Sequence, residues 1–172
     1  MLHRKQGVLM KRWMSVAGLV MVASLLSYAA EPSPTFARLQ KLVGTWEAKR
    51  PDGKTSQLEV TSVSAGSALM IMQPDEGYGS MVTMIHPDGN RVLLTHYCAT
   101  KNQPRMVADA MTDGKTIKFN FLDVTNLAEG QPGSMRGLVL ILPDDDHMSQ
   151  QWTFRAADGK EITETFNLVR KK

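Results

Sequence analysis

The sequence has one cysteine, Cys98, and little excess of charge of either sign. A single cysteine cannot form a disulfide within its own chain, so a disulfide-stabilised scaffold is excluded. Residues 1–30 hold four of the 20 basic residues and none of the 17 acidic ones, which leaves 16 basic and 17 acidic residues in the remainder. Nucleic-acid-binding proteins need a clustered basic face. We therefore predict no nucleic-acid partner for this near-neutral part of the chain.

Long apolar runs are also scarce, and the one near the N-terminus is short. Residues 1–13 form a stretch with four basic residues, and Met14–Leu26 are mostly apolar. The small residues Ser27 and Ala29 follow directly. This order is typical of a secretory signal, and the apolar run is shorter than the roughly 20 residues that span a bilayer. We predict a signal peptide at residues 1–29 and a single secreted or periplasmic domain at residues 30–172. An uncleaved membrane anchor is the alternative.

The remaining sequence lacks coiled-coil heptads and low-complexity tracts, and it is divided instead by frequent turns. Asp88-Gly89, Asp113-Gly114 and Asp158-Gly159 are typical of tight hairpins, because Asp-Gly favours positive backbone angles. The runs between the turns alternate with a period of two, which predicts half-buried strands. Ten strands are predicted, at residues 44–50, 55–63, 67–73, 80–86, 91–98, 105–111, 116–123, 134–142, 147–155 and 161–169. A short helix is predicted near Thr35–Val43.

Ten short strands in a chain of this length are typical of a sandwich or a closed barrel. The uniform hairpin spacing favours the barrel, because a Greek key needs long crossing connections. Closure also removes exposed strand edges. We therefore predict an all-β fold: an up-and-down antiparallel β-barrel of about ten strands, with a short N-terminal helix closing one end.

Gly44-Thr45-Trp46, at the head of the first predicted strand, resembles the Gly-x-Trp opening of lipocalins and their calycin relatives. The resemblance implies that Trp46 packs at the closed end of the barrel under a basic residue of the last strand, and Arg170 stands at that place. Residues 94–106 are similar to stretches of uncharacterised exported bacterial lipocalin-like proteins. Ten strands match the fatty-acid-binding and nitrobindin branches, but Glu47–Arg50 stand where nitrobindins continue with glycines. We predict no cofactor.

The predicted connections differ between the two ends of the barrel. The three longest connections, Pro74–Gly79, Ala99–Pro104 and Val124–Gly133, all follow odd-numbered strands and therefore meet at one end. Every connection at the other end is predicted to be a four-residue turn. Function in such scaffolds lies in the loops and the barrel mouth, so we place the candidate site at the loop-rich end.

The histidines divide between the same two ends. His86 and His147 lie at the end with the short turns, and His96 is predicted at the mouth. Three scattered histidines do not form a zinc site, and we predict no bound metal. His96 and Cys98 share one face of their strand and Tyr97 takes the other, but the pattern leaves open which face points inward.

The predicted ligand-binding residues combine this strand with the mouth loops and two polar positions on apolar stripes. They are His96, Tyr97, Cys98, Asn102, Gln103, Arg105, Asp123, Asn126, Tyr78, Gln150 and Glu164. Arg105 is suited to binding an anionic head group, and a surface ion pair is the alternative. Asp123 is expected on the same strand face as Phe119 and Phe121. Met70, Met72 and Met84 are the methionines expected to line a cavity.

Four functions fit these features. The first is an exported binding protein that holds a mainly apolar or amphiphilic small molecule with a polar or anionic head. The second is an acid–base enzyme using Tyr97, Arg105, Asp123 and Glu164, with no catalytic residue assigned by spacing. The third is haem chemistry with His96 as axial ligand. The fourth is an envelope protein whose barrel is filled by its own side chains.

Overall fold

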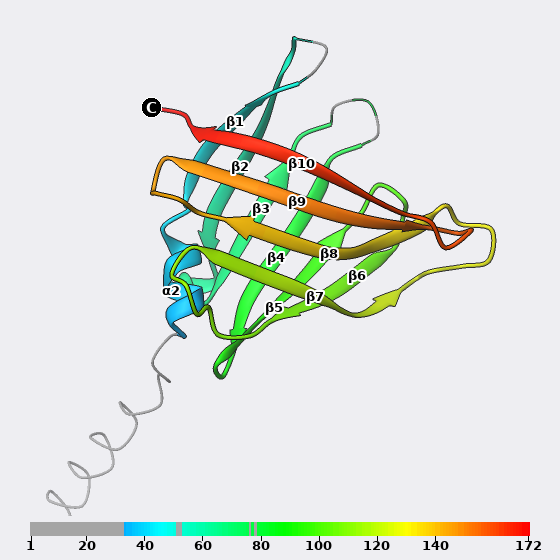
Figure 1. The fold of residues 1–172 in the computed structure, drawn as a ribbon, viewed down its shortest axis with the longest axis horizontal. Helices are drawn as coiled ribbons and strands as arrows, with labels where there is room; N and C mark the ends of the chain where they lie inside the picture. The colour runs from blue at the N-terminus through cyan, green and yellow to red at the C-terminus, as the bar shows by residue number, and fades with distance from the viewer. Residues whose placement is uncertain (1–32, 51–52, 76, 78) are drawn as a thin grey trace, which may run out of the picture. The chain divides into compact units, whose positions relative to one another are not determined.

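In the computed structural model, which describes residues 33–50, 53–75, 77 and 79–172, ten antiparallel strands close into one barrel (Figure 1). The strands are β1 (Gly44–Lys49), β2 (Thr55–Val63), β3 (Ala68–Gln73), β4 (Met81–Asp88), β5 (Arg91–Tyr97), β6 (Gln103–Ala108), β7 (Thr116–Thr125), β8 (Gly133–Ile141), β9 (His147–Ala156) and β10 (Glu161–Arg170). Each strand pairs with its neighbours in sequence, and β1 pairs with β10. The predicted all-β barrel is confirmed. No helix in the described part of the chain is long and apolar enough to cross a membrane.

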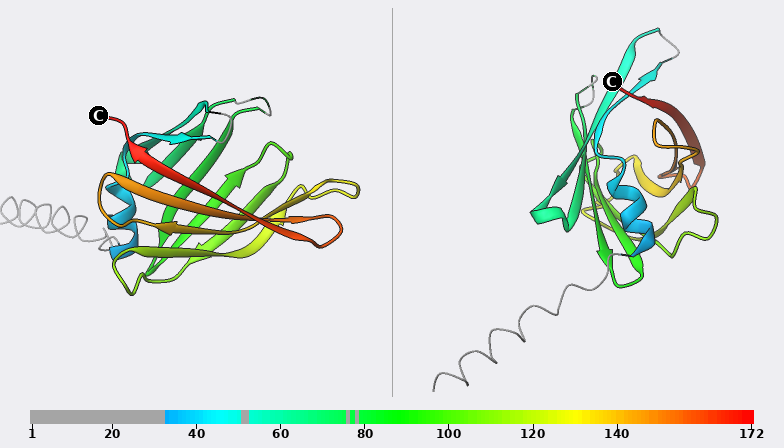
Figure 2. Two further views of the ribbon diagram at one scale, coloured as in Figure 1. Left: turned by 45° about the horizontal axis from the view of Figure 1, so that its top comes forward. Right: turned by 90° about the vertical axis from the view of Figure 1, so that its left-hand side faces the viewer.

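The short helix α2 (Pro34–Gln40) precedes the first strand and lies across one end of the barrel (Figure 2). Ser33 caps it by accepting a hydrogen bond from the backbone N–H of Phe36 at 3.1 Å. Phe36 and Leu39, on its inner face, are fully buried in the core. The end of the barrel that holds α2, the β8–β9 turn and the last residues of β10 is called the closed end below. The predicted signal segment, residues 1–29, lies outside the described residues.

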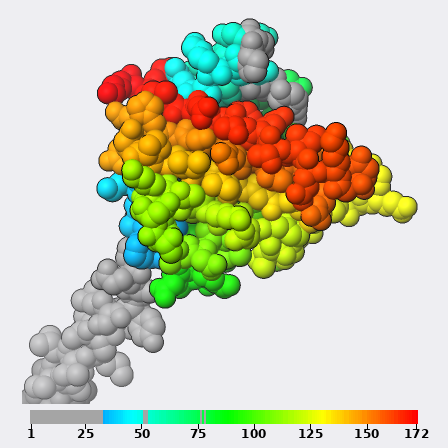
Figure 3. Space-filling model, viewed as in Figure 1, coloured from blue at the N-terminus to red at the C-terminus, as the bar shows by residue number. Residues whose placement is uncertain are grey.

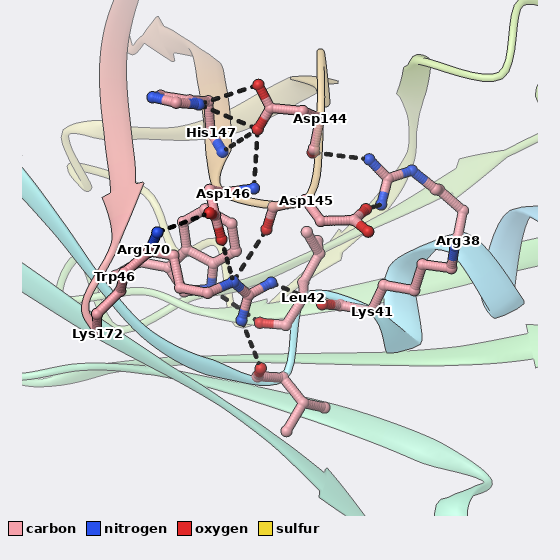
Figure 4. Close-up of polar contacts among 11 residues, drawn as sticks. Arg38, Lys41, Leu42, Trp46, Asp144, Asp145, Asp146, His147, Arg170 and Lys172 are labelled. Atoms are coloured by element: carbon pink, nitrogen blue, oxygen red, sulfur yellow. Dashed lines mark hydrogen bonds and ion pairs between the residues drawn. The ribbon is translucent and has the colours of Figure 1, made fainter.

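Trp46 and Arg170 join the elements of the closed end (Figure 4). Trp46 is fully buried, and its indole Nε1 donates to the carbonyl of Leu42 at 2.8 Å. The Arg170 guanidinium lies 4.4 Å from the centroid of the Trp46 ring. Arg170 also donates to the carbonyls of Lys41 and Val43, each at 2.7 Å. The stacking that the Gly-x-Trp resemblance implies is therefore present, and it ties the first and last strands to the chain that follows α2.

A second arginine completes the closed end from the helix side. Arg38 of α2 forms an ion pair with Asp145 at 2.8 Å and donates to the carbonyl of Asp144 at 2.9 Å. Arg170 donates from the other side to the Asp145 carbonyl at 2.9 Å. Both arginines thus hold the β8–β9 turn, as Figure 4 shows.

The connections at the closed end are not all four-residue turns, and the one between β6 and β7 differs most from the prediction. β6 ends at Ala108, so the chain from Asp109 to Lys115 is longer than the expected four-residue turn. The extra length brings Met111 against the helix, where its backbone N–H donates to Thr35 Oγ1 at 2.9 Å. Met111 also packs against the buried core beside α2.

The seam between β1 and β10 is short. β1 pairs with β10 only where Trp46 and Glu47 lie opposite Arg170 and Val169. Beyond these residues the β1–β2 hairpin diverges from β9 and β10, as both views in Figure 2 show. In Figure 3, by contrast, β7 to β10 form a continuous outer wall. The opposite end of the barrel, where β5–β6, β7–β8 and β9–β10 connect, is called the open end below.

Candidate binding site at the open end of the barrel

The inward-facing residues of β9 and β10 are buried near the closed end of the barrel and more exposed toward the open end. Near the closed end Met148 and Leu168 lie opposite each other and are buried. Toward the open end Ile162 lies opposite Phe154 on the same face, yet it is 48% exposed. Because β1 does not pair with this part of β10, the interior face is open to solvent there. The open end therefore exposes part of the inner wall of the barrel.

His96 lies deep on the inward face of β5. It is only 4% exposed, in line with buried Val92 and Leu94, whereas Tyr97 is 49% exposed on the outer face. His96 pairs with Thr83 of β4, and its Nδ1 lies 2.8 Å from Thr83 Oγ1. The structure thus decides which face of this strand points inward.

A ring contact joins His96 of β5 to Trp152 of β9, and polar contacts continue from Trp152 along β9. The imidazole ring lies 5.0 Å from the Trp152 ring, centroid to centroid, at an angle of 44°. Trp152 Nε1 donates to Gln150 Oε1 at 3.1 Å, and Gln150 Nε2 contacts the sulfur of Met148 at 3.8 Å. The Trp152 and Gln150 contacts hold the indole against the imidazole.

The remaining ring nitrogen of His96 has no such contact. Nε2 is buried, and it has no hydrogen-bond partner among the described residues. Burial lowers the pKa of His96 to about 4, so the imidazole is neutral near pH 7. A neutral imidazole has one donor nitrogen and one acceptor nitrogen, and a buried polar atom without a partner is uncommon in native proteins. His96 Nε2 is therefore a point at which a bound molecule would complete the hydrogen bonding.

The wall around this nitrogen is apolar and partly accessible. Trp152 and Phe166 pack against the buried core but are only partly buried. Phe154 and Phe121 are also partly buried, on the inward faces of β9 and β7. Aromatic side chains with one exposed edge contribute large contact areas to a ligand at little entropic cost.

Gln150 and Glu164 lie on inward faces, as the stripes predicted. Gln150 is buried and hydrogen-bonded to Trp152. Glu164 lies opposite Trp152 on β10, and its side chain is exposed at the open seam. These two residues and His96 are the predicted site residues that face the interior together.

The structure places Arg105 and Asp123 on the outer wall, where they form an ion pair. Arg105 Nε donates to Asp123 Oδ1 at 2.6 Å, and both side chains are about half exposed. The hydrogen bond from Arg105 lowers the pKa of Asp123. The expected alignment of Asp123 with Phe119 and Phe121 is wrong, because the β6–β7 register shifts and inserts Leu122, which turns Asp123 outward.

The other predicted loop residues contact one another or the backbone. Asn102 is fully buried and donates to the Gly133 carbonyl at 2.8 Å, which links the β5–β6 loop to the start of β8. Gln103 accepts a hydrogen bond from Thr125, and Asn126, in the left-handed region at φ 63°, lies 3.5 Å from the Lys101 carbonyl. Cys98 is partly buried, and its backbone closes the β5–β6 turn. Tyr78 lies outside the described residues.

The structure does not bring together the four residues of the acid–base hypothesis. Tyr97, Arg105 and Asp123 lie on the outer wall, and Glu164 faces the interior. The expectation that Met70, Met72 and Met84 line a cavity is also wrong. Their neighbours Leu69, Ile71 and Ile85 are the buried residues of β3 and β4, so these methionines lie on the outer face.

A separate hollow of about 340 Å³ lies on the outside of the barrel. Its lining residues come from the β6–β7 connection and β7: Asp109, Ala110, Met111, Thr112, Asp113, Thr116, Lys118 and Asn120. Backbone N–H groups of Thr116 and Lys115 bond the Asp113 carboxylate and lower its pKa to about 2. That carboxylate organises the turn through its bonds to the backbone.

Comparison with known proteins supports the fold alone. No family model matches the sequence, and no curated protein matches it. The chain is similar to the crystal structure of Rv2717c from M. tuberculosis, with a TM-score of 0.53 and 18% sequence identity over 83% of this chain and 100% of that one. At this level of identity the likeness extends to the barrel and to no site residue.

Proposed function

We propose that this chain is an exported, lipocalin-like protein of the calycin type that binds a small, mainly apolar molecule in the open end of its barrel. The observation that carries the proposal is the buried His96 imidazole, whose Nε2 has no partner among the described residues. The imidazole lies beside Trp152, and part of the inner wall near the open end is exposed to solvent. Export rests on the signal-like order of residues 1–29.

Burial of apolar surface supplies the affinity in this proposal. Covering about 200 Å² of aromatic and aliphatic wall contributes about 5 kcal/mol at roughly 25 cal/mol per Å². The neutral imidazole adds one hydrogen bond, which orients the molecule more than it tightens binding. The ligand class is therefore an apolar or amphiphilic molecule with at least one polar group.

Fluorescent fatty-acid probes test the proposal directly. The purified protein is expected to bind the probe saturably and to co-purify with molecules from a lipid extract that mass spectrometry identifies. The variant His96→Phe keeps a ring at this position but removes Nε2, and it is expected to weaken binding about five- to tenfold.

The matched control is His86→Phe, because His86 is exposed on the outer face and, among the described residues, bonds only the Pro87 carbonyl. This variant is expected to bind as the wild type does. Absence of both saturable binding and a co-purifying ligand would contradict the proposal. It would favour a barrel filled by its own side chains.

A further inference from the structure

Arg136 lies at an irregularity of β8 that the sequence pattern does not show. On the β9 side, Met135 lies opposite Phe154 and Gly137 lies opposite Thr153, so Arg136 is an extra residue in β8. On the β7 side, Asn120 lies opposite Gly137. Continuing that register places Arg136 opposite Phe121. The bulge brings Met135 to the side of the inward-facing Phe154, whereas Arg136 keeps its alternation with the residues that follow it.

Arg136 shares the inward face of β8 with the buried residues Leu138 and Leu140, which alternate with it along the strand. Phe121 faces inward, because its register partner Met106 is fully buried. The Arg136 guanidinium carbon lies 4.1 Å from the centroid of the Phe121 ring, in stacking position. On β8 the next inward residue toward the closed end is Leu138, which lies opposite Trp152. Arg136 is therefore one inward position nearer the open end than the His96–Trp152 contact.

The Arg136 side chain is partly buried without an anionic partner. Its Nε is buried and has no hydrogen-bond partner, and the guanidinium forms no ion pair with any residue that the structure describes. Burial, and next the charge of Arg155, lower the pKa of Arg136. Arg155 is itself paired with Glu161 at 2.7 Å. A partly desolvated cation of this kind is stabilised by an added anion.

Glu164 is the other charged residue that we place on this inner wall, and it does not neutralise Arg136. It lies on β10, two strands away, and the acidic side chain whose charge acts on Arg136 is Glu161. One guanidinium offers paired N–H donors that match a single carboxylate. The geometry thus suits a monoanion at the rim of the site.

We infer that Arg136 binds the carboxylate of an amphiphilic monoanion at the open end, with the apolar part of the molecule directed inward along Phe121 and Trp152. This inference rests on the proposed function and specifies its ligand. His96 Nε2, deeper in the barrel, then forms its hydrogen bond with an uncharged polar group of the ligand. The charged head lies toward solvent, and the ligand enters with its apolar end first.

The test compares a dansyl-labelled undecanoic acid with its methyl ester, which lacks the charge. The wild type is expected to bind the acid about tenfold more tightly than the ester, as one charged hydrogen-bonded pair would give. Arg136→Met keeps an apolar side chain over Phe121 and is expected to abolish this preference while still binding the ester. The matched control Arg105→Met removes an outer-wall arginine and is expected to keep the preference.

Equal binding of acid and ester by the wild type, or a preference that survives Arg136→Met, would overturn the role of Arg136 and leave the proposed function standing. Failure of both probes to bind the wild type would overturn the two together. Circular dichroism checks the fold of each variant. If Arg136→Met does not fold, the wild type alone decides, because added salt is expected to weaken binding of the acid and not of the ester.

Discussion

Replacing Trp46 with alanine is expected to lower the free energy of unfolding by about 3–5 kcal/mol. Trp46 is fully buried, so the substitution leaves a large cavity at the closed end. It also removes the donor to the Leu42 carbonyl and the ring under the Arg170 guanidinium. Because the whole stability of a domain is typically about 5–15 kcal/mol, this single change removes a large share of it.

Urea denaturation followed by circular dichroism measures this effect, and the same substitution at Trp152 is the control. Trp152 is only partly buried and lies at the open end, so Trp152→Ala is expected to cost less stability but to weaken probe binding. Equal losses of stability for the two variants would contradict the assignment of Trp46 to the closed end and of Trp152 to the site.

Lowering the pH from 7 to 4 is expected to remove about 3 kcal/mol of stability through His96 alone. Burial lowers the pKa of His96 in the folded state from 6.5 to about 4. Between these two values the unfolded chain binds a proton at this residue and the folded chain does not. The free energy of unfolding therefore falls as the pH falls through this window, and this contribution is constant below about pH 4.

The measurement is the difference in unfolding free energy between the wild type and His96→Phe, taken at several pH values. The difference is expected to shift by about 3 kcal/mol in favour of the variant between pH 7 and pH 4. The same comparison with His86→Phe controls for loss of a histidine from the outer face. A difference for His96→Phe that does not depend on pH would show that the imidazole is not buried as described.

The two-residue rhythm and the Asp-Gly turns predicted the barrel closely, because both depend on local sequence. Nine of the ten strands were predicted within two residues at both ends, β6 ends three residues earlier than predicted, and the Trp46–Arg170 stacking is present as the Gly-x-Trp resemblance implied. Hairpin registers follow from short turns, so a chain of hairpins leaves little freedom in strand order. The closed end was therefore predictable in its main elements.

The site was predicted less well, because it depends on which face of each strand points inward. Residues 68–72 are apolar on both faces, so their alternation did not show that Met70 and Met72 lie outside. The bulge in β7 adds one residue and reverses the alternation locally, which turned Asp123 outward. Arg136 alternates with the buried Leu138 and Leu140, and its stacking on Phe121 shows that it lies on the inner wall. Thr83 was not predicted as a site residue, because only the register of β4 against β5 shows that it lies opposite His96.

The most direct test of the account is a nitrogen-detected NMR titration of the histidine rings with undecanoic acid. We predict a saturable shift of the His96 Nε2 resonance, because that nitrogen lies on the inner wall at the open end and lacks a partner among the described residues. The ring resonances of His86 and His147, on the outer surface, are expected to stay in place. A ligand that binds while His96 Nε2 does not shift would contradict the placement of the site inside the barrel.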